Sequence, residues 1–231
     1  VLVMLHFDIL TLFPGIFSSF LNESLINRGI EKNQLSINLF NFRKFGIGKH
    51  LKVDDSPYGG GPGMLLKVEP ISLSLEERKE KNLAIGRKTH TILLTPQGVP
   101  FTQKKAEDLS LKEDVIALVC GRYEGFDERI RNLVDEEISG GDFICLGGEV
   151  IAMAIIEAVI RLKPNFLGNS NSTKKESFTE SLLEFPQYTR PEIFKGMAVP
   201  KELLSGNRER IAEWRRENAF RKTKIQRPDL L

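Results

Sequence analysis

Long apolar runs, cysteine and histidine are scarce in this chain, and each scarcity excludes a class of protein. No apolar run reaches the roughly 18 residues that a membrane-spanning helix needs, so we expect no membrane partner. No Gly-x-Ser-x-Gly motif is present, and the three histidines stand far apart, beside no second group at metal-ligand spacing. A serine hydrolase and a zinc site are therefore disfavoured.

Only two cysteines occur, Cys120 and Cys145, and they form no Cys-x-x-Cys pair. Both have apolar neighbours, which predicts reduced core side chains of a cytoplasmic protein. The first residues, Val1-Leu2-Val3-Met4, lack the basic region and the cleavage site of a secretory signal peptide. We therefore expect a cytoplasmic location.

The composition is that of a globular protein, since 41% of the 231 residues are hydrophobic and 28% are charged. This length accommodates one large domain, or one domain with a smaller appendage. The net charge of +2 hides an asymmetry, because residues 182–231 hold 11 Lys and Arg against 7 Asp and Glu, a net +4. A basic tail indicates an anionic partner such as nucleic acid, although a solvated helical surface would have the same composition.

The first part of the chain predicts an α/β domain. Residues 6–13 and 35–42 alternate as strands, and residues 16–28 between them have a helical pattern that stops at Gly29. A charged helix is predicted over residues 75–82. Strand, helix and strand in this order are typical of a sheet with helical crossovers.

A βαβ unit follows. Strand 91–94 is predicted to end in a turn at residues 95–98, and a helix over 102–109 leads to a second strand at 115–120. The two strands should be parallel with a right-handed crossover. Sheets of this kind bind ligands at the carboxyl ends of their strands.

Two glycine-containing loops follow the strand at 115–120. Gly121–Arg129 comes directly after it, and Ser139–Glu149 leads into an apolar helix over 150–162 that Pro164 closes. Because glycine has no Cβ, its backbone can approach a flat ligand closely. Either loop alone would be read as a tight turn, but two of them beside one buried strand favour a cofactor site.

The segment from Asp54 to Met64 contains four glycines, two prolines and Tyr58, and it can form neither a helix nor a central strand. Such a loop is costly in chain entropy, which favours a binding role. No Gly-Lys-Ser/Thr follows, so the segment is not a Walker loop. It is not a dinucleotide fingerprint either, because no buried strand leads straight into it.

Beyond Pro164 the composition changes, and we predict three parts: a cofactor-binding domain over 1–167, a polar linker over 168–181 and a helical domain over 182–231. In the helix predicted for residues 205–221, Ile211, Trp214 and Asn218 share one face, while Arg208, Arg215 and Arg216 point outward.

Several motifs occur in an order that is more specific than any one of them. They are Asp54–Met64, Thr95–Gly98, Cys120–Gly125, Gly141-Asp142, Gly147–Glu149, Tyr188–Pro191 and Leu204–Asn207. Together they resemble the bacterial tRNA (guanine-N1)-methyltransferase family, which methylates N1 of the guanosine immediately 3′ of the anticodon (position 37 of the tRNA). The resemblance covers nearly the whole chain.

The resemblance implies an α/β fold: a parallel-sheet, SPOUT-type domain with a C-terminal trefoil knot, plus a small helical C-terminal domain. It also implies S-adenosyl-L-methionine as cofactor, tRNA as substrate, and a homodimer with shared active sites. General connection rules predict no knot, so this expectation comes from the resemblance alone.

The resemblance assigns residues to three roles. Glu176, Arg161 and Glu124 match catalytic positions: Glu176 stands where the family has an aspartate as general base, Arg161 is expected near the guanine O6, and Glu124 beside a Mg²⁺ ion. The cofactor positions are Leu93, Leu94, Thr95, Pro96, Gly98, Gly121, Tyr123, Gly125, Gly140, Gly141, Asp142, Phe143, Ile144, Cys145, Gly147 and Gly148. The tRNA positions are Asp54, Asp55, Tyr58, Gly59, Gly60, Ser177, Arg190 and Arg215.

Other interpretations remain open. Glu176 can be an ordinary solvated linker residue. Arg161 can be a cation that interacts favourably with the dipole at a helix C-terminus. A non-catalytic RNA-binding protein on the same fold would explain the basic tail and Tyr58, but not two cofactor-type loops. A nucleotide-dependent oxidoreductase is disfavoured, because no glycine fingerprint follows a strand.

Overall fold

The computed structural model describes residues 4–112, 114–167, 176–178 and 181–231. The chain forms two compact units, Val1–Leu167 and Gly168–Leu231. None of the helices in the described part of the chain combines the length and the apolarity that crossing a bilayer requires.

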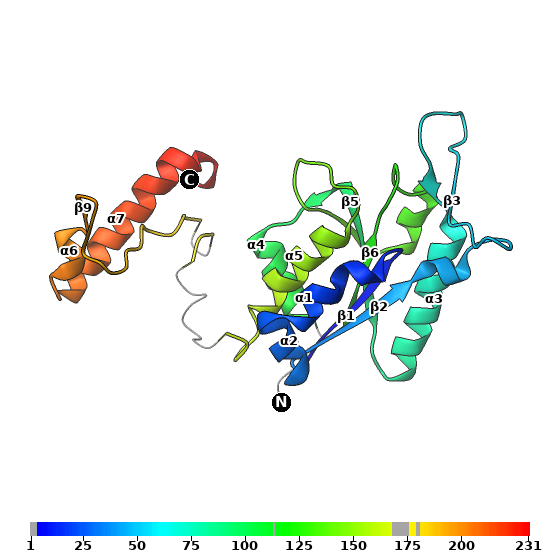
Figure 1. The fold of residues 1–231 in the computed structure, drawn as a ribbon, viewed down its shortest axis with the longest axis horizontal. Coiled ribbons are helices and arrows are strands. Elements are labelled where there is room, and N and C mark those ends of the chain that lie inside the picture. Colours follow the sequence, from blue (N-terminus) through cyan, green and yellow to red (C-terminus); the bar gives the residue numbers. More distant parts are fainter. Residues whose placement is uncertain (1–3, 113, 168–175, 179–180) are drawn as a thin grey trace. The chain divides into compact units, whose positions relative to one another are not determined.

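The first unit is built on a five-stranded parallel sheet, with the strand order β2-β1-β6-β5-β7 (Figure 1). Its strands are β1 (Leu5–Thr11), β2 (Leu35–Asn41), β5 (Thr89–Pro100), β6 (Val115–Cys120) and β7 (Glu136–Ser139). The central strand β6 is buried along its whole length, as its apolar run predicts. β5 and β6 are adjacent and parallel, so the predicted βαβ unit is confirmed.

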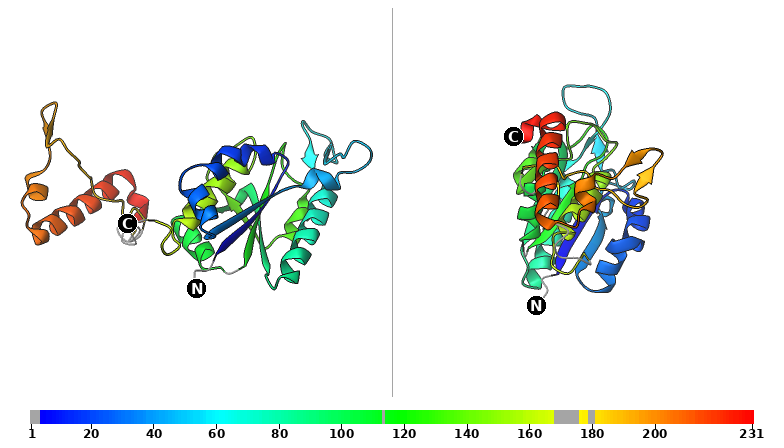
Figure 2. Two further views of the ribbon diagram at one scale, coloured as in Figure 1. Left: turned by 60° about the horizontal axis from the view of Figure 1, so that its bottom comes forward. Right: turned by 90° about the vertical axis from the view of Figure 1, so that its left-hand side faces the viewer.

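Helices cover both faces of the sheet (Figure 2). Alternate residues of β6 point to opposite faces, so that Ile116, Leu118 and Cys120 join one core cluster and Ala117 and Val119 the other. The first face packs against α1 (Ser18–Asn22), α2 (Ser24–Glu31), α4 (Gln103–Ser110) and α5 (Glu149–Ile160). The second face packs against α3 (Val68–Ala84).

Two helices predicted for the first unit differ clearly from those observed, and the helix predicted for 205–221 is observed over Arg208–Gln226. The helix predicted for 16–28 is broken, because the backbone at Glu23 is extended and Ser24 has a positive φ of 56°. A 3₁₀ turn at Pro14–Phe17, α1 and α2 take its place. The charged helix predicted for 75–82 is the second half of α3, whose first turn contains Pro70, a place where proline leaves no helical hydrogen bond unmade.

The turn predicted at 95–98 is wrong. β5 continues to Pro100, and its pairing with β7 shifts register between Leu94 and Val99, which makes an irregular bulge. A Cβ on Gly98 would lie 2.5 Å from the backbone nitrogen of Ile138. The segment 95–98 therefore packs against β7 and stays within β5. Its proline and glycine had predicted that the chain would leave the sheet there.

The second unit contains a short hairpin and two helices: β8 (Ile193–Phe194), β9 (Met197–Ala198), α6 (Lys201–Leu204) and α7 (Arg208–Gln226). The Asn207 side chain caps α7 by accepting hydrogen bonds from two backbone N–H groups. The predicted face is confirmed, since Asn218 is buried and Ile211 and Trp214 are half-buried. The ring of Trp214 lies 6.3 Å from that of Tyr188.

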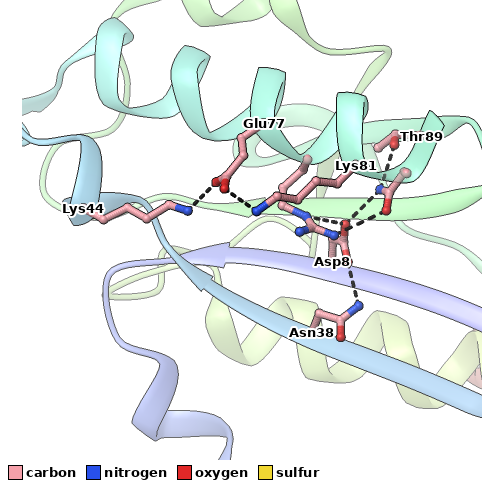
Figure 3. A network of polar contacts seen from close by, with 8 residues as sticks. Asp8, Asn38, Lys44, Glu77, Lys81 and Thr89 are labelled. Carbon is pink, nitrogen blue, oxygen red and sulfur yellow. Dashed lines mark hydrogen bonds and ion pairs between the residues drawn. The ribbon is translucent and has the colours of Figure 1, made fainter. Parts of the chain in front are cut away.

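A buried ionic network joins β1, β2 and α3 (Figure 3). Asp8 is fully buried, and its carboxylate accepts hydrogen bonds from Asn38 (3.0 Å), Arg78 (3.1 Å) and Asn82 (3.0 Å). The guanidinium of Arg78 also covers the ring of Phe40 at 3.9 Å. Such a network fixes the position of α3 on the sheet, because the buried charge loses its partners if the helix shifts.

Arg78→Met should lower the free energy of unfolding by about 3 kcal/mol, because it leaves a buried carboxylate without its cation. Urea denaturation followed by circular dichroism measures this loss. Glu77→Gln is the matched control on the same helix, since Glu77 pairs with Lys44 and Lys81 near the surface. Equal denaturation midpoints for the two variants would contradict a stabilising role of the Asp8 network.

Candidate functional site

A pocket of about 670 Å³ lies at the carboxyl ends of β5, β6 and β7. Four segments line most of it: 93–97 from the β5 bulge, 121–128 after β6, 138–140 at the end of β7, and 143–148 before α5. Both glycine-containing loops thus line one cavity, at the edge of the sheet where parallel strands place ligands.

Most of the predicted cofactor residues line this pocket. They are Leu93, Leu94, Thr95, Pro96, Gly121, Tyr123, Gly125, Gly140, Phe143, Ile144, Cys145, Gly147 and Gly148. Gly98, Gly141 and Asp142 lie outside the lining. Gly98 packs on β7, and Gly141 forms a tight turn in which its carbonyl accepts a hydrogen bond from the N–H of Phe143 (2.9 Å).

The two glycine loops touch backbone to backbone. The N–H of Gly148 donates to the carbonyl of Gly121 over 3.1 Å. A Cβ on Gly148 would lie 3.0 Å from the Cα of Cys120, which is tighter than ordinary van der Waals contact. Glycine at position 148 therefore allows the two loops to form one continuous wall.

Five charged side chains also line the pocket, and most of them are paired. Arg131 contacts Glu128 at 2.7 Å and also Glu137, and these hydrogen bonds raise its pKa. A hydrogen bond from the exposed guanidinium of Arg129 lowers the pKa of Asp127. Glu124 also lines the pocket. The pocket therefore combines an apolar interior with ionised groups of both signs, which suits a ligand that is itself part apolar and part zwitterionic.

The glycine-rich segment predicted to bind tRNA is attached to this pocket. Asp54 and Asp55 form β3, which pairs with β4 (Leu65–Leu66). Leu66 then hydrogen-bonds twice to the loop after β6: its N–H donates to the carbonyl of Gly125 (2.9 Å), and its carbonyl accepts from the N–H of Asp127 (2.9 Å). A displacement of this hairpin would thus displace the wall of the pocket.

The tip of the hairpin is open to solvent. Tyr58 is fully exposed, and Gly59 and Gly60 both have positive φ angles, 84° and 79°. At the base, Lys67 bonds to Asp55 at 2.7 Å and lowers the pKa of that carboxyl. An exposed aromatic ring on a rigid base is a surface on which a nucleic-acid base can stack.

The remaining predicted residues are not brought to the pocket within the first unit. Arg161 is the C-terminal cap of α5, and α5 begins at the pocket, so Arg161 lies about 18 Å along the helix from it. Glu176, Ser177, Arg190 and Arg215 belong to the second unit. Ser177 accepts a hydrogen bond from the N–H of Glu184, and the guanidinium of Arg215 lies over the ring of Phe185.

The prediction that both cysteines are core residues is wrong for one of them. Cys120 is buried, and burial raises its pKa. Cys145 is exposed and lines the pocket. Its apolar neighbours Ile144 and Leu146 are also exposed, since all three belong to a loop and no strand or helix carries them into the core.

The sequence analysis assigned no role to two side chains beside the pocket, Arg122, which lines it, and Glu149, which is buried next to it. Glu149 is only 1% exposed, and its carboxylate lies 2.9 Å from the guanidinium of Arg122 and 2.7 Å from the hydroxyl of Thr11. A glutamate that opens an otherwise apolar helix was the signal available in the sequence, because such a residue is buried only with a partner.

Comparison with known proteins gives two findings. The profile of the family described as tRNA (Guanine-1)-methyltransferase TrmD matches residues 5–231. A tRNA (guanine-N(1)-)-methyltransferase from Geobacillus kaustophilus is 52% identical over 229 residues, which cover 98% of this chain and 91% of the relative. One of the same name from Staphylococcus aureus is 51% identical over 225 residues, or 97% of this chain and 89% of the relative.

Proposed function

The chain belongs to the tRNA (guanine-1)-methyltransferase family, and from this premise we propose how its own residues perform the reaction. It is an enzyme that methylates N1 of guanine in tRNA, and a methyltransferase of this family uses S-adenosylmethionine. Our proposal concerns the cofactor site, the catalytic groups, the target guanosine and the assembly.

We propose that S-adenosylmethionine binds in the pocket at the ends of β5, β6 and β7. The observation that carries this proposal is the backbone contact between Gly121 and Gly148. Side chains at these positions would force the loops apart, whereas bare backbone leaves room for a flat adenine ring and offers it amide and carbonyl groups. The volume of about 670 Å³ lies within the range of small-molecule sites.

The catalytic groups follow from the chemistry of guanine. N1 carries a weakly acidic proton and is a poor nucleophile until that proton leaves, so the carboxylate of Glu176 would accept it. Negative charge then spreads to O6, where the guanidinium of Arg161 would stabilise it. S-adenosylmethionine held in this pocket would supply the methyl group, which would pass from its sulfur to the deprotonated N1.

The mechanism routes no step through a magnesium ion. Glu124 lines the pocket, and its carboxylate would hold the Mg²⁺ ion that the family resemblance places beside the cofactor. Among the described residues, no group of three His, Cys, Asp or Glu side chains converges on a point where a metal ion could sit, so the protein would supply only part of the ion's ligands. Such an ion would stabilise developing negative charge.

We propose that the hairpin around Tyr58 and the second unit bind the anticodon arm and present the guanosine immediately 3′ of the anticodon. Residues 182–231 carry a net charge of +4, with 11 Lys and Arg. Several of these side chains lie exposed on α7, among them Arg208, Arg215 and Arg216. Phosphate contacts by such residues position an RNA without reading its sequence. Because tRNA is the substrate, we expect the enzyme in the cytoplasm.

We propose that the enzyme is a homodimer with shared active sites, and that its cofactor loops form the trefoil knot implied by the family. Two observations support the dimer. Arg161 lies about 18 Å along α5 from the pocket, which adjoins the start of that helix, so a second copy of the chain would supply the arginine that acts at this pocket. In addition, apolar side chains around the start of α5, including Ile144, Leu146 and Val150, are exposed.

A methylation assay tests the function. The protein, a tRNA transcript and labelled S-adenosylmethionine should give N1-methylguanine at the position 3′ of the anticodon, identified by nuclease digestion and mass spectrometry. A transcript with adenine at that position is the control and should accept no label. Binding of tRNA without methyl transfer would favour a non-catalytic RNA-binding protein, and methylation elsewhere would overturn the proposed target.

A further inference from the structure

A buried ion pair links the two glycine loops from behind the pocket wall. Arg122, in the first loop, places Nη2 2.9 Å from Oε2 of Glu149, and its Nε donates to Oε1 over 3.2 Å. Its Nη1 also donates to the carbonyl of Leu146 in the second loop, over 3.3 Å. One guanidinium thus contacts the first residue of α5 and the loop that precedes it.

The pair lies directly against the backbone of the second loop. A Cβ on Gly147 would lie 2.4 Å from Nε of Arg122 and 2.5 Å from Oε2 of Glu149. The space beside this glycine is therefore filled by the pair itself. Gly147 lines the pocket on one side and packs on the ion pair on the other.

The carboxylate of Glu149 is also hydrogen-bonded to the end of β1. The hydroxyl of Thr11 donates to Oε1 of Glu149 over 2.7 Å and accepts a hydrogen bond from the N–H of Phe13 over 2.9 Å. The ring of Phe13 lies 4.6 Å from the guanidinium of Arg122. Three parts of the fold, the end of β1, the loop after β6 and the start of α5, therefore meet at one buried carboxylate.

We propose that Arg122 and Glu149 are positioning residues for the cofactor: they hold the two glycine loops at a fixed separation before S-adenosylmethionine enters. This inference rests on the proposed function of the pocket. Loops that contain this much glycine lose considerable chain entropy when a ligand orders them. Loops already fixed by a buried, hydrogen-bonded ion pair have lost that freedom on folding, so the cofactor binds without that cost.

The expected result is a loss of cofactor affinity with little change in chemistry. Arg122→Lys keeps the charge but loses the fork that reaches Glu149 and Leu146 together. Glu149→Gln keeps the shape but removes the charge. Each should raise the Kd of S-adenosylmethionine by about 10- to 100-fold, since the cofactor must then order the loops itself and bear the loss of their chain entropy. The rate of methyl transfer at saturating cofactor should stay near the wild-type value.

Calorimetry on the full-length protein without tRNA measures the affinity, and a single-turnover assay measures the rate. Lys104→Arg is the matched control, because it also exchanges one cation for another, at an exposed pair with Asp108 (2.8 Å) on α4 outside the pocket lining. Its Kd should equal that of the wild type. If the pair acts as a unit, the double variant Arg122→Lys with Glu149→Gln should bind no more weakly than the worse single variant.

Thr11→Val covers the case in which the charged variants do not fold. It removes only the hydroxyl that donates to Glu149 and should raise the Kd about three- to tenfold, the effect of one hydrogen bond. Wild-type affinity in Thr11→Val and in every charged variant that folds would overturn the inference. A wild-type protein that binds no S-adenosylmethionine would instead overturn the proposed function, so the two failures are distinguishable.

Discussion

Glu176→Gln should slow methyl transfer by about two to four orders of magnitude, the contribution of a general base. The amide keeps the shape of the side chain but cannot accept the N1 proton of guanine. Single-turnover assays with saturating tRNA and S-adenosylmethionine measure this step directly. The affinity for S-adenosylmethionine should not change, because the role proposed for the carboxylate is at the guanine, and Glu176 belongs to a different unit from the pocket.

Two controls define the role of Glu176. Glu176→Asp should stay active, since it restores the residue that the family usually has at this position. Glu192→Gln, a change at an exposed glutamate of the same unit, should leave the rate unaltered. Methylation by Glu176→Gln at nearly the wild-type rate would show that the base lies elsewhere, with Asp54 and Asp55 as the next candidates.

Mixing two inactive variants should restore activity if the active sites are shared between subunits. An Arg161→Ala subunit retains Glu176, and a Glu176→Gln subunit retains Arg161. If each site takes its arginine from one subunit and its base from the other, the heterodimer holds one site with both groups intact and one with neither. A heterodimer purified through two different affinity tags should therefore have about half the activity of the wild-type dimer.

The parent homodimers are the controls for this experiment, and both should be nearly inactive. An inactive heterodimer would mean that both groups of a site come from the same chain. A monomeric wild-type protein in light scattering would contradict the assembly itself. A monomer would also leave the distance of Arg161 from the pocket along α5 without an explanation.

The elements that could be predicted are those whose pattern is local. The run Val115–Cys120 became the central buried strand, and Pro164 follows soon after the apolar helix α5 ends. Both glycine loops could be assigned to one pocket, because the carboxyl ends of neighbouring parallel strands meet at one edge of the sheet. For these elements, the local sequence pattern and the tertiary contacts favour the same arrangement.

The predictions that failed depend on partners distant in the sequence. The segment 95–98 has the composition of a turn, but β7 supplies pairing that keeps it in the sheet. Cys145 and its neighbours have the composition of a core, but they lie in a loop that lines the pocket, and they are exposed. Composition indicates which environment a residue prefers. Tertiary contacts override that preference where they contribute more free energy.

The sequence by itself determined the α/β class, the order of strands and helices around the pocket, and the family, because each depends on residues close together in the chain or on motifs in a fixed order. Only the tertiary structure decided that Glu149 meets both Arg122 and Thr11, since Thr11 lies 138 residues away from it in the chain. A buried charge needs a partner, but the sequence does not say which one. The fold supplies it by bringing the ends of β1, β6 and β7 to the start of α5.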